Sequence, residues 1–337
     1  MAIDYPSLDK PTAGAFRFNT DSSQLEIYRG DQWTGVLAIS PEQLTGGTRG
    51  LFMGGDPAVN IIDYINISST GNATDFGDRT VTGYGGACSS RTRGVCAGQA
   101  DNTLSNVIDY VTISSTGNAL DFGDRTISST RFQGASNTTR AMWFGGMGSG
   151  ATDDEIDYVT VATTGNAVDF GNLATACEGA SGNIASQTRS VMTGGNTSPN
   201  SGFLNTIQYI TIATTGNTAD FGDIVRAQTW SGGASNSIRG IIACGYAGPA
   251  AANVNTIEYV TISTLGNAVD FGNYGDERWN VGAVASPTRA CLAGGYAPYD
   301  TRIEYIQIMT TGDAVDFGDS TNSRRYNGGA SNGHGGL

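Results

Sequence analysis

The sequence contains a single histidine and no cysteine pair at the CxxC spacing among its 337 residues. The five cysteines are an odd number at irregular intervals, which supports neither a disulfide framework nor a zinc site. His334 lies in the glycine-rich segment "SNGHGGL", so the sequence favours neither a Ser-His-Asp triad nor a histidine metal cluster. We therefore predict a protein that is not an enzyme and that uses no cofactor and no metal.

Basic residues are also scarce. Lys and Arg number 18 against 31 Asp and Glu, which gives a formal net charge of −13. Because nucleic-acid binding depends on cationic side chains that neutralise phosphates, this balance opposes a nucleic-acid partner. No stretch approaches the about 18 continuous apolar residues of a membrane helix, and the N-terminus has no export-signal pattern. We predict neither membrane insertion nor export.

Glycine is abundant, with 49 residues, and 12 of them fall in an octapeptide written six times with two glycines in each copy, as in "GNATDFGD" and "GNAVDFGN". Each copy belongs to a longer unit with an Arg, an apolar run, Gly-Gly, a variable stretch, I-x-Y, the octapeptide, a second variable stretch and a G-[GA]-A-S-like segment. The anchor tyrosines are Tyr64, Tyr110, Tyr158, Tyr209, Tyr259 and Tyr305. These tyrosines are 46 to 51 residues apart, and repeats of this length are typical of propeller blades or helical arrays. The short β-branched runs exclude helices.

We read four strands in each unit: the apolar run, the I-x-Y segment, the segment that ends in D-F-G, and the A-S segment. The fixed Tyr-to-Phe spacing predicts a hairpin with its turn at T-G-N. The first unit lacks an A-S segment, and "YNGGASN" near the C-terminus supplies one. The sequence thus predicts an all-β fold, a six-bladed β-propeller over residues 45–337 whose first blade is completed by the C-terminal strand.

The D-F-G-[DN] motif has two interpretations. It offers oxygen ligands for calcium, but a group present in every unit is more simply a structural turn in which Asp accepts backbone N–H bonds. The arginine before each apolar run is expected to pair with a neighbouring Asp, or else to line an anion site. These arginines are Arg49, Arg93, Arg140, Arg189, Arg239 and Arg289.

Candidate ligand-binding residues lie in the stretches that differ between units. Both variable stretches of a unit are expected on one face, which includes loops 147–155, 196–206, 246–256 and 296–302. Aromatic rings beside arginines suit stacking on sugars and hydrogen bonding of hydroxyls or carboxylates, whereas the alternative is that the rings only cover the core. The predicted residues are Tyr84, Phe132, Trp230, Trp279 and Tyr326, with Arg79, Arg125, Arg226, Arg278 and Arg325.

Residues 1–44 lie outside the repeats and read as three strands, Ala15–Asn19, Leu25–Tyr28 and Trp33–Leu37. So small a sheet rarely stabilises itself, so we expect it to pack on the propeller or on other chains. The residues expected to dock are Phe18, Leu25, Tyr28 and Trp33.

This segment resembles a module of tailed-phage virion proteins with the pattern P-x-x-G-x-x-R-[FY]-N-[ST]-x-x-x-x-L-E-x-Y-x-G-x-x-W. The matching residues are Pro11, Gly14, Arg17, Phe18, Asn19, Thr20, Leu25, Glu26, Tyr28, Gly30 and Trp33. The six repeats look similar to those of phage structural proteins, and the Gly-Gly doublets partly resemble kelch repeats without their Trp.

The resemblance implies a virion structural protein, assembled in the host cytoplasm, with residues 1–44 contacting other virion proteins and favouring a trimer. The leading expectation is a tail-fibre or appendage component whose propeller is displayed to bind host-surface glycan. A purely structural decoration or tail-associated protein that uses the propeller for protein contacts is the alternative. A glycan-degrading enzyme that uses a carboxylate pair comes third.

Overall fold

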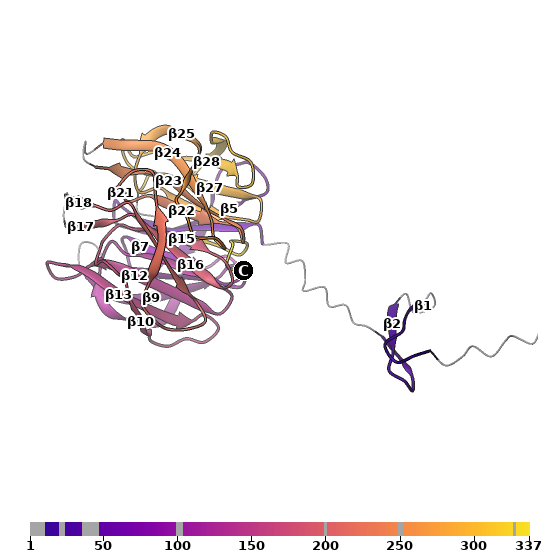
Figure 1. The fold of residues 1–337 in the computed structure, drawn as a ribbon. Coiled ribbons are helices and arrows are strands. Elements are labelled where there is room, and N and C mark those ends of the chain that lie inside the picture. The colour runs from indigo at the N-terminus through magenta and orange to yellow at the C-terminus, as the bar shows by residue number, and fades with distance from the viewer. Residues whose placement is uncertain are drawn as a thin grey trace, which may run out of the picture. The chain divides into compact units, whose positions relative to one another are not determined.

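The computed structural model describes residues 11–19, 24–35, 47–98, 104–198, 201–248, 252–325 and 328–337. Across these ranges the chain forms β-strands and no helix, which confirms the predicted all-β class (Figure 1). It follows that no helix long and apolar enough to cross a membrane is present in the described part. The chain divides into two compact units, Met1–Thr45 and Gly46–Leu337.

The N-terminal unit is a three-stranded antiparallel sheet, as the sequence predicts. Its strands are β1 (Phe16–Asn19), β2 (Gln24–Tyr28) and β3 (Trp33–Gly35), with β2 in the middle. The predicted third strand extends to Leu37, and its last two residues lie outside the described residues.

The second unit contains antiparallel sheets that we number 1 to 6 by repeat. Sheet 1 is β30 (Gly328–Ser331), β4 (Arg49–Gly55), β5 (Val59–Asn66) and β6 (Thr74–Asp78). Sheet 2 is β7 (Gly85–Ser89), β8 (Arg93–Gly98), β9 (Ser105–Thr112) and β10 (Leu120–Ser129). Sheet 3 is β11 (Gln133–Ser136), β12 (Arg140–Met147), β13 (Thr152–Thr160) and β14 (Val168–Asn172).

The remaining sheets follow the same order with small additions. Sheet 4 is β15 (Ser181–Ala185), β16 (Arg189–Thr193), β19 (Thr206–Thr211) and β20 (Ala219–Asp223), with a separate hairpin of β17 (Asn196–Ser198) and β18 (Ser201–Phe203). Sheet 5 is β22 (Gly232–Ser235), β23 (Arg239–Ala247), β24 (Ala252–Thr261) and β25 (Val269–Arg278), and β21 (Gln228–Thr229) also pairs with β23. Sheet 6 is β26 (Gly282–Ala285), β27 (Arg289–Ala293), β28 (Arg302–Gln307) and β29 (Val315–Asp319).

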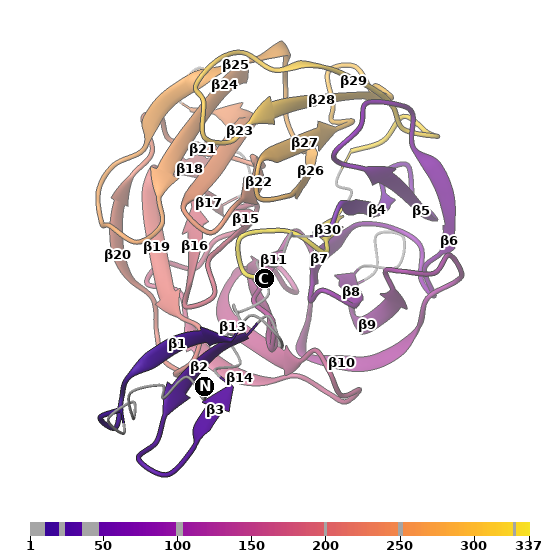
Figure 2. The same cartoon turned by 90° about the vertical axis from the view of Figure 1, so that its right-hand side faces the viewer.

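The C-terminal strand completes the first sheet, which confirms that part of the prediction. Gly328 of β30 pairs with Met53 of β4, and Ser331 pairs with Gly50. The first strands of the sheets also contact one another in the order β7, β11, β15, β22, β26 and β30, and β30 contacts β7. Figure 2 shows the sheets arrayed around a centre where the C-terminus lies.

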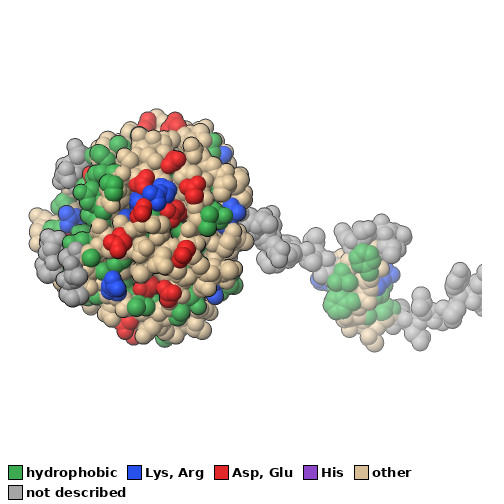
Figure 3. All heavy atoms as spheres, turned by 90° about the horizontal axis from the view of Figure 1, so that it is seen from above, with side chains coloured by type: hydrophobic (Ala, Val, Ile, Leu, Met, Phe, Trp, Pro, Cys, Tyr) green, Lys and Arg blue, Asp and Glu red, His purple; other side chains and the backbone are tan. Residues whose placement is uncertain are grey.

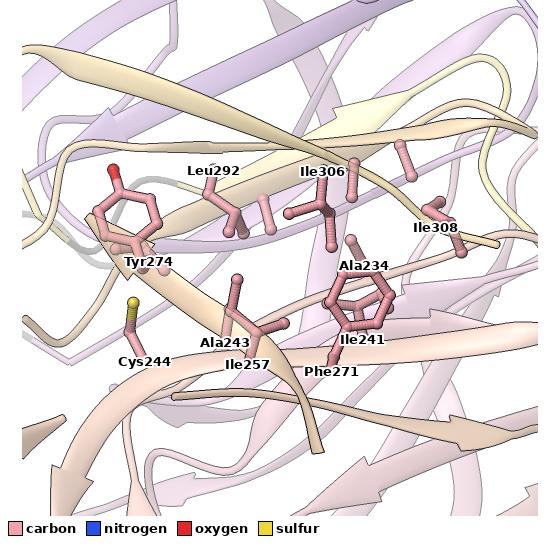
Figure 4. Packing of buried hydrophobic residues seen from close by; sticks show 14 residues of the cluster. Ala234, Ile241, Ala243, Cys244, Ile257, Phe271, Tyr274, Leu292, Ile306 and Ile308 are labelled. Carbon is pink, nitrogen blue, oxygen red and sulfur yellow. The ribbon is translucent and has the colours of Figure 1, made fainter. Parts of the chain in front are cut away.

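Apolar side chains fill the space between neighbouring sheets. Ile257 and Phe271 of sheet 5 belong to one buried cluster with Leu292, Ile306 and Ile308 of sheet 6 (Figure 4). The Phe of each D-F-G is buried and packs edge-on against the anchor tyrosine of its own sheet. Each sheet thus uses its neighbour to bury its apolar face, which isolated four-stranded sheets cannot do.

The repeated octapeptide joins neighbouring sheets. Gly117 and Ala119 of sheet 2 donate backbone N–H groups to the carbonyls of Phe76 and Asp78 in sheet 1, at 2.8 and 2.7 Å. The Asn118 side chain accepts from the Asp78 N–H at 3.1 Å. We call this set of bonds the inter-sheet joint. Its other copies join Gly165 to Phe122, Gly216 to Phe170, Gly266 to Phe221, Gly312 to Phe271 and Gly71 to Phe317.

The prediction that T-G-N forms the turn of the hairpin was wrong. The hairpin itself forms, because β5 pairs with β6, but Tyr64 and Thr74 are the last paired residues before a long connection. Within that connection the Gly-Asn-Ala segment bonds to the preceding sheet instead of closing its own hairpin. The outer strand of each sheet is thereby covered, which removes an exposed edge.

The glycine of D-F-G is required by this contact. Gly77 has a φ of 143°, and a Cβ added there would lie 2.5 Å from the Gly117 carbonyl oxygen. The equivalent glycine in each other sheet meets the neighbouring backbone at 2.4 or 2.5 Å. The sequence therefore repeats this glycine because two backbones approach each other closely.

The arginine that leads each second strand does not pair with Asp, and that prediction was wrong. Arg93 lies over the Tyr110 ring, 4.7 Å from its centroid, and donates to the Val161 carbonyl in sheet 3 at 3.0 Å. The other five also stack on the anchor tyrosine and bond to a carbonyl of the next sheet. A guanidinium can stack its planar face on the ring while it donates N–H groups in its own plane, whereas an ammonium has no planar face to stack.

Candidate functional site

The second variable stretch of one repeat meets the first variable stretch of the next repeat, so both kinds of stretch lie on one face, as predicted. The stretches meet through antiparallel backbone pairs, in which one residue precedes a first strand and the other follows the Gly-Gly doublet, which is Cys-Gly in repeat 5. The pairs are Asp56 with Arg325, Thr130 with Met147, Glu178 with Asn196, Thr229 with Tyr246 and Trp279 with Tyr296. We call this the loop face.

On the loop face, sheets 4 to 6 carry contacting aromatic rings, which we call the aromatic cluster. Its members are Phe203, Trp230, Tyr246, Trp279, Tyr296 and Tyr299. Trp230 and Trp279 stack at 4.8 Å between centroids and 30° between planes, and Tyr246 contacts both. Tyr296 is 37% exposed and the other rings are half-buried, so the cluster has a solvent-facing side.

An ion pair from sheet 1 lies at the end of the aromatic cluster. The Arg325 guanidinium is 4.7 Å from the Trp279 centroid and 4.6 Å from that of Tyr296. Its Nε donates to Asp56 at 2.7 Å, and the Tyr299 hydroxyl donates to the same carboxylate oxygen. Desolvation and this hydrogen bond raise the pKa of Tyr299 to about 12, so its hydroxyl stays protonated at neutral pH.

Of the ten predicted ligand-binding residues, the structure brings Trp230, Trp279 and Arg325 together. Tyr84, half-buried, and Phe132, buried, line a small depression with Trp230 and Arg131. Tyr326 lies outside the described residues.

Three of the other four predicted arginines are buried and paired with carboxylates. Arg79 and Arg125 are buried and pair with Asp109 and Asp157 of the next sheet, at 3.3 and 3.1 Å. Arg278 is also buried and pairs with acidic side chains, and Arg226 is exposed. The expectation that these arginines donate to a ligand is therefore wrong at Arg79, Arg125 and Arg278, because each is buried and already paired with a carboxylate.

A third arginine, Arg324, makes the same kind of buried pair with Asp63, at 2.9 Å. In every sheet the residue before the anchor tyrosine accepts a backbone N–H from the preceding sheet, as Gln208 does from Ala174 and Glu258 does from Val225. These polar groups hold sheets together and leave the loop face to other residues.

The aromatic cluster contains residues that the sequence did not single out. Tyr246 and Tyr296 directly follow the Gly-Gly-type doublets of repeats 5 and 6, and Phe203 and Tyr299 lie a few residues further along their loops. All four fall in loops predicted to form the binding face. The available signal was the aromatic residue after the doublet, where repeats 1 to 4 have Asp56, Gln99, Met147 and Asn196.

The N-terminal docking residues do not share a face. Cross-strand pairing puts Phe16 opposite Ile27 and Phe18 opposite Leu25, and Phe16, Phe18 and Leu25 are 63%, 62% and 42% exposed. Figure 3 shows apolar side chains on the visible surface of this unit.

The other face of that sheet carries Tyr28 and Trp33, whose rings lie 5.3 Å apart. Arg17 stacks on Trp33 and pairs with Glu26. Tyr28 and Trp33 are thus engaged within the sheet, while Phe18 and Leu25 lie on an exposed apolar face.

Metal ligands and histidine chemistry gain no support from the described residues. Within them, no three or more His, Cys, Asp and Glu side chains gather closely enough to hold a metal. The D-F-G carboxylates weighed as calcium ligands, such as Asp75, are exposed at separate places. His334 instead accepts or donates at Ser89 and Ser136, on the first strands of sheets 2 and 3. Desolvation lowers its pKa to about 4.

Comparison with known proteins gives no family for this chain: no family model and no curated protein matches it.

Proposed function

We propose that this chain is a non-enzymatic virion protein of a tailed phage whose second unit is a six-bladed β-propeller that binds host-surface glycan. The observation that carries the binding proposal is the aromatic cluster on the loop face, flanked by Arg325 and Asp56. Half-exposed rings beside hydrogen-bonding groups suit the apolar faces and hydroxyls of sugars.

The propeller proposal is supported by contacts that recur in all six sheets. Each sheet has its neighbour on both sides through the first strands, and the joint from Gly71 to Phe317 links sheet 1 to sheet 6. A radial array of four-stranded sheets with protected edges has these properties.

The virion proposal depends on the N-terminal motif and on the exposed apolar face of that unit. Phe16, Phe18 and Leu25 would contact other virion proteins or further copies of the chain, with a trimer as the favoured state. The second unit would then be displayed outward on a tail fibre or appendage.

The binding proposal is tested by Trp279→Ala in the full chain. We expect retention on immobilised bacterial surface polysaccharides to fall about tenfold, since loss of one stacking contact removes ~1 to 3 kcal/mol. Leu265→Ala is the control, because Leu265 is a 57% exposed apolar residue in the connection between β24 and β25, at the opposite end of the strands from the loop face. Equal retention of both variants would argue against a sugar site here.

The alternative function is a structural part that uses the loop face for protein contacts. Labelling particles with an antibody against the loop face distinguishes it from the glycan-binding function. Binding of the antibody to intact particles is expected for a displayed receptor-binding unit. A loop face that is hidden in the particle and accessible only in the isolated chain would favour the structural alternative.

A further inference from the structure

The charge around the aromatic cluster distinguishes between classes of glycan. Arg325 lies over the rings of Trp279, Tyr296 and Tyr299, and its charge is matched by Asp56 at 2.7 Å. Arg131, beside Trp230 in the neighbouring depression, is likewise paired with Glu178 at 2.9 Å. An acidic sugar would have to compete with these carboxylates for the guanidinium groups, and the chain as a whole carries a formal charge of −13.

The extent of the cluster indicates the length of the ligand. The rings are linked from Phe203 through Tyr246, Trp279 and Tyr296 to Tyr299, with successive centroids 5.9, 6.0, 5.4 and 5.0 Å apart. They come from sheets 4, 5 and 6, and Asp56 and Arg325 extend the row to sheet 1. A single sugar would leave most of this row uncovered.

We propose that the aromatic cluster binds an uncharged, extended oligosaccharide that runs along the loop face across sheets 4 to 6, and that it discriminates against acidic glycans. This inference rests on the proposed glycan-binding function. Stacking on rings would supply the affinity, and the Asp56 carboxylate together with the Tyr299 hydroxyl would bond sugar hydroxyls. Because no net charge is neutralised on binding, the affinity should depend little on salt.

The test uses the full chain and an array that carries neutral hexose oligomers, uronic-acid and sialic-acid oligomers, and the corresponding monosaccharides. The sequence has a single lysine, Lys10, in the N-terminal unit, so coupling a fluorophore to amines leaves the loop face unmodified. We expect binding to neutral oligomers that strengthens with length, and a loss of about tenfold in Trp279→Ala, equivalent to ~1.4 kcal/mol.

Two controls keep the outcomes distinct. Asp56→Asn removes the negative charge beside Arg325, so this variant should gain binding to the acidic oligomers relative to the parent chain. Strong, salt-sensitive binding of the parent to acidic oligomers would overturn the inference and leave the glycan-binding function standing. Binding to no oligomer, or binding unchanged in Trp279→Ala, would overturn both.

Discussion

The two ends of the strands in the second unit behave differently. At one end, each sheet bonds to the D-F-G strand of its neighbour through a Gly-Asn-Ala segment, which is Gly-Asn-Thr in sheet 4 and Gly-Asp-Ala in sheet 6, with nearly the same distances in all six copies. At the other end, the residue after the Gly-Gly-type doublet is Asp, Gln, Met, Asn or Tyr in different repeats, and the rings gather in sheets 4 to 6. A contact that must fit its own copy in the next sheet cannot vary, while a loop that touches solvent can.

The most severe way to break the repeated end is removal of residues 322–337. This truncation removes β30 and exposes β4, whose Leu51 and Met53 are fully buried. We expect loss of cooperative thermal unfolding or aggregation, because the edge and the core of sheet 1 become solvent-exposed. Calorimetry measures this, and a soluble truncated chain with an unchanged transition would contradict the role given to β30.

A buried ion pair between sheets gives the next largest effect. In Asp157→Asn the Arg125 guanidinium, which is fully buried, loses its carboxylate. We expect a loss of about 3 to 5 kcal/mol in the free energy of unfolding by urea denaturation. The matched variant is Glu258→Gln, since sheet 4 already has Gln208 at that position, and it should cost less than about 1 kcal/mol. Equal costs would mean that the charge at Asp157 is unimportant.

The inter-sheet joint is tested by two glycines with the same backbone conformation. Gly222 has a φ of 152° and Gly266 a φ of 150°. A Cβ added to Gly222 would lie 2.4 Å from the carbonyl oxygen of Gly266, whereas a Cβ added to Gly266 would have no atom within 4 Å. Gly266→Ala should cost about 1 kcal/mol and Gly222→Ala about 1 to 3 kcal/mol more. If both variants unfold at the same urea concentration, the close approach of the backbones is not what requires glycine.

The smallest effect is a pH dependence from His334. Its pKa is lowered from 6.5 to about 4, so the unfolded chain binds the proton more readily. This contribution to stability is full above pH 6.5 and is lost as the pH falls towards 4, by at most about 3 kcal/mol. Urea denaturation across this range should show a shallower pH dependence in His334→Gln. The same slope in both proteins would assign the dependence to carboxylates instead.

The repeats allowed the strands and the role of β30 to be predicted, because spacing between identical residues does not depend on side-chain contacts. The role of the arginines could not be predicted in this way. Arg79 and Arg125 each follow a D-F-G-D, and the next repeats have Asp109 and Asp157 before the anchor tyrosine. Where no arginine directly follows D-F-G-[DN], the residue before the next anchor tyrosine is Gln or Glu in three repeats. In the remaining repeat it is Asp63, which pairs with Arg324 instead. That covariation within one chain was the missed signal.

Variable loop length also hid which aromatic residues are equivalent. The last residue of each first strand pairs with the residue that follows the leading arginine of the second strand, which gives a common reference point. Counted back from that last residue, the residues that share a position are Tyr84, Arg131, Trp230 and Asn280. Trp279 therefore lies one residue before that position and Phe132 one after it. These neighbouring positions lead to different surroundings: Phe132 is buried beneath Arg125, whereas Trp230 and Trp279 stack on each other in the aromatic cluster.

Every joint pairs an equivalent donor segment with an equivalent acceptor strand. Which sheets contact each other therefore does not depend on which sheets are consecutive in the sequence. The contact of Gly71 with Phe317 is chemically the same as that of Gly117 with Phe76, although one is formed between distant parts of the chain and the other between neighbouring repeats. A circularly permuted gene that starts at another repeat should therefore encode the same set of contacts. A tandem of fewer repeats would leave one donor segment and one acceptor strand unmatched, and each would be available to a second molecule.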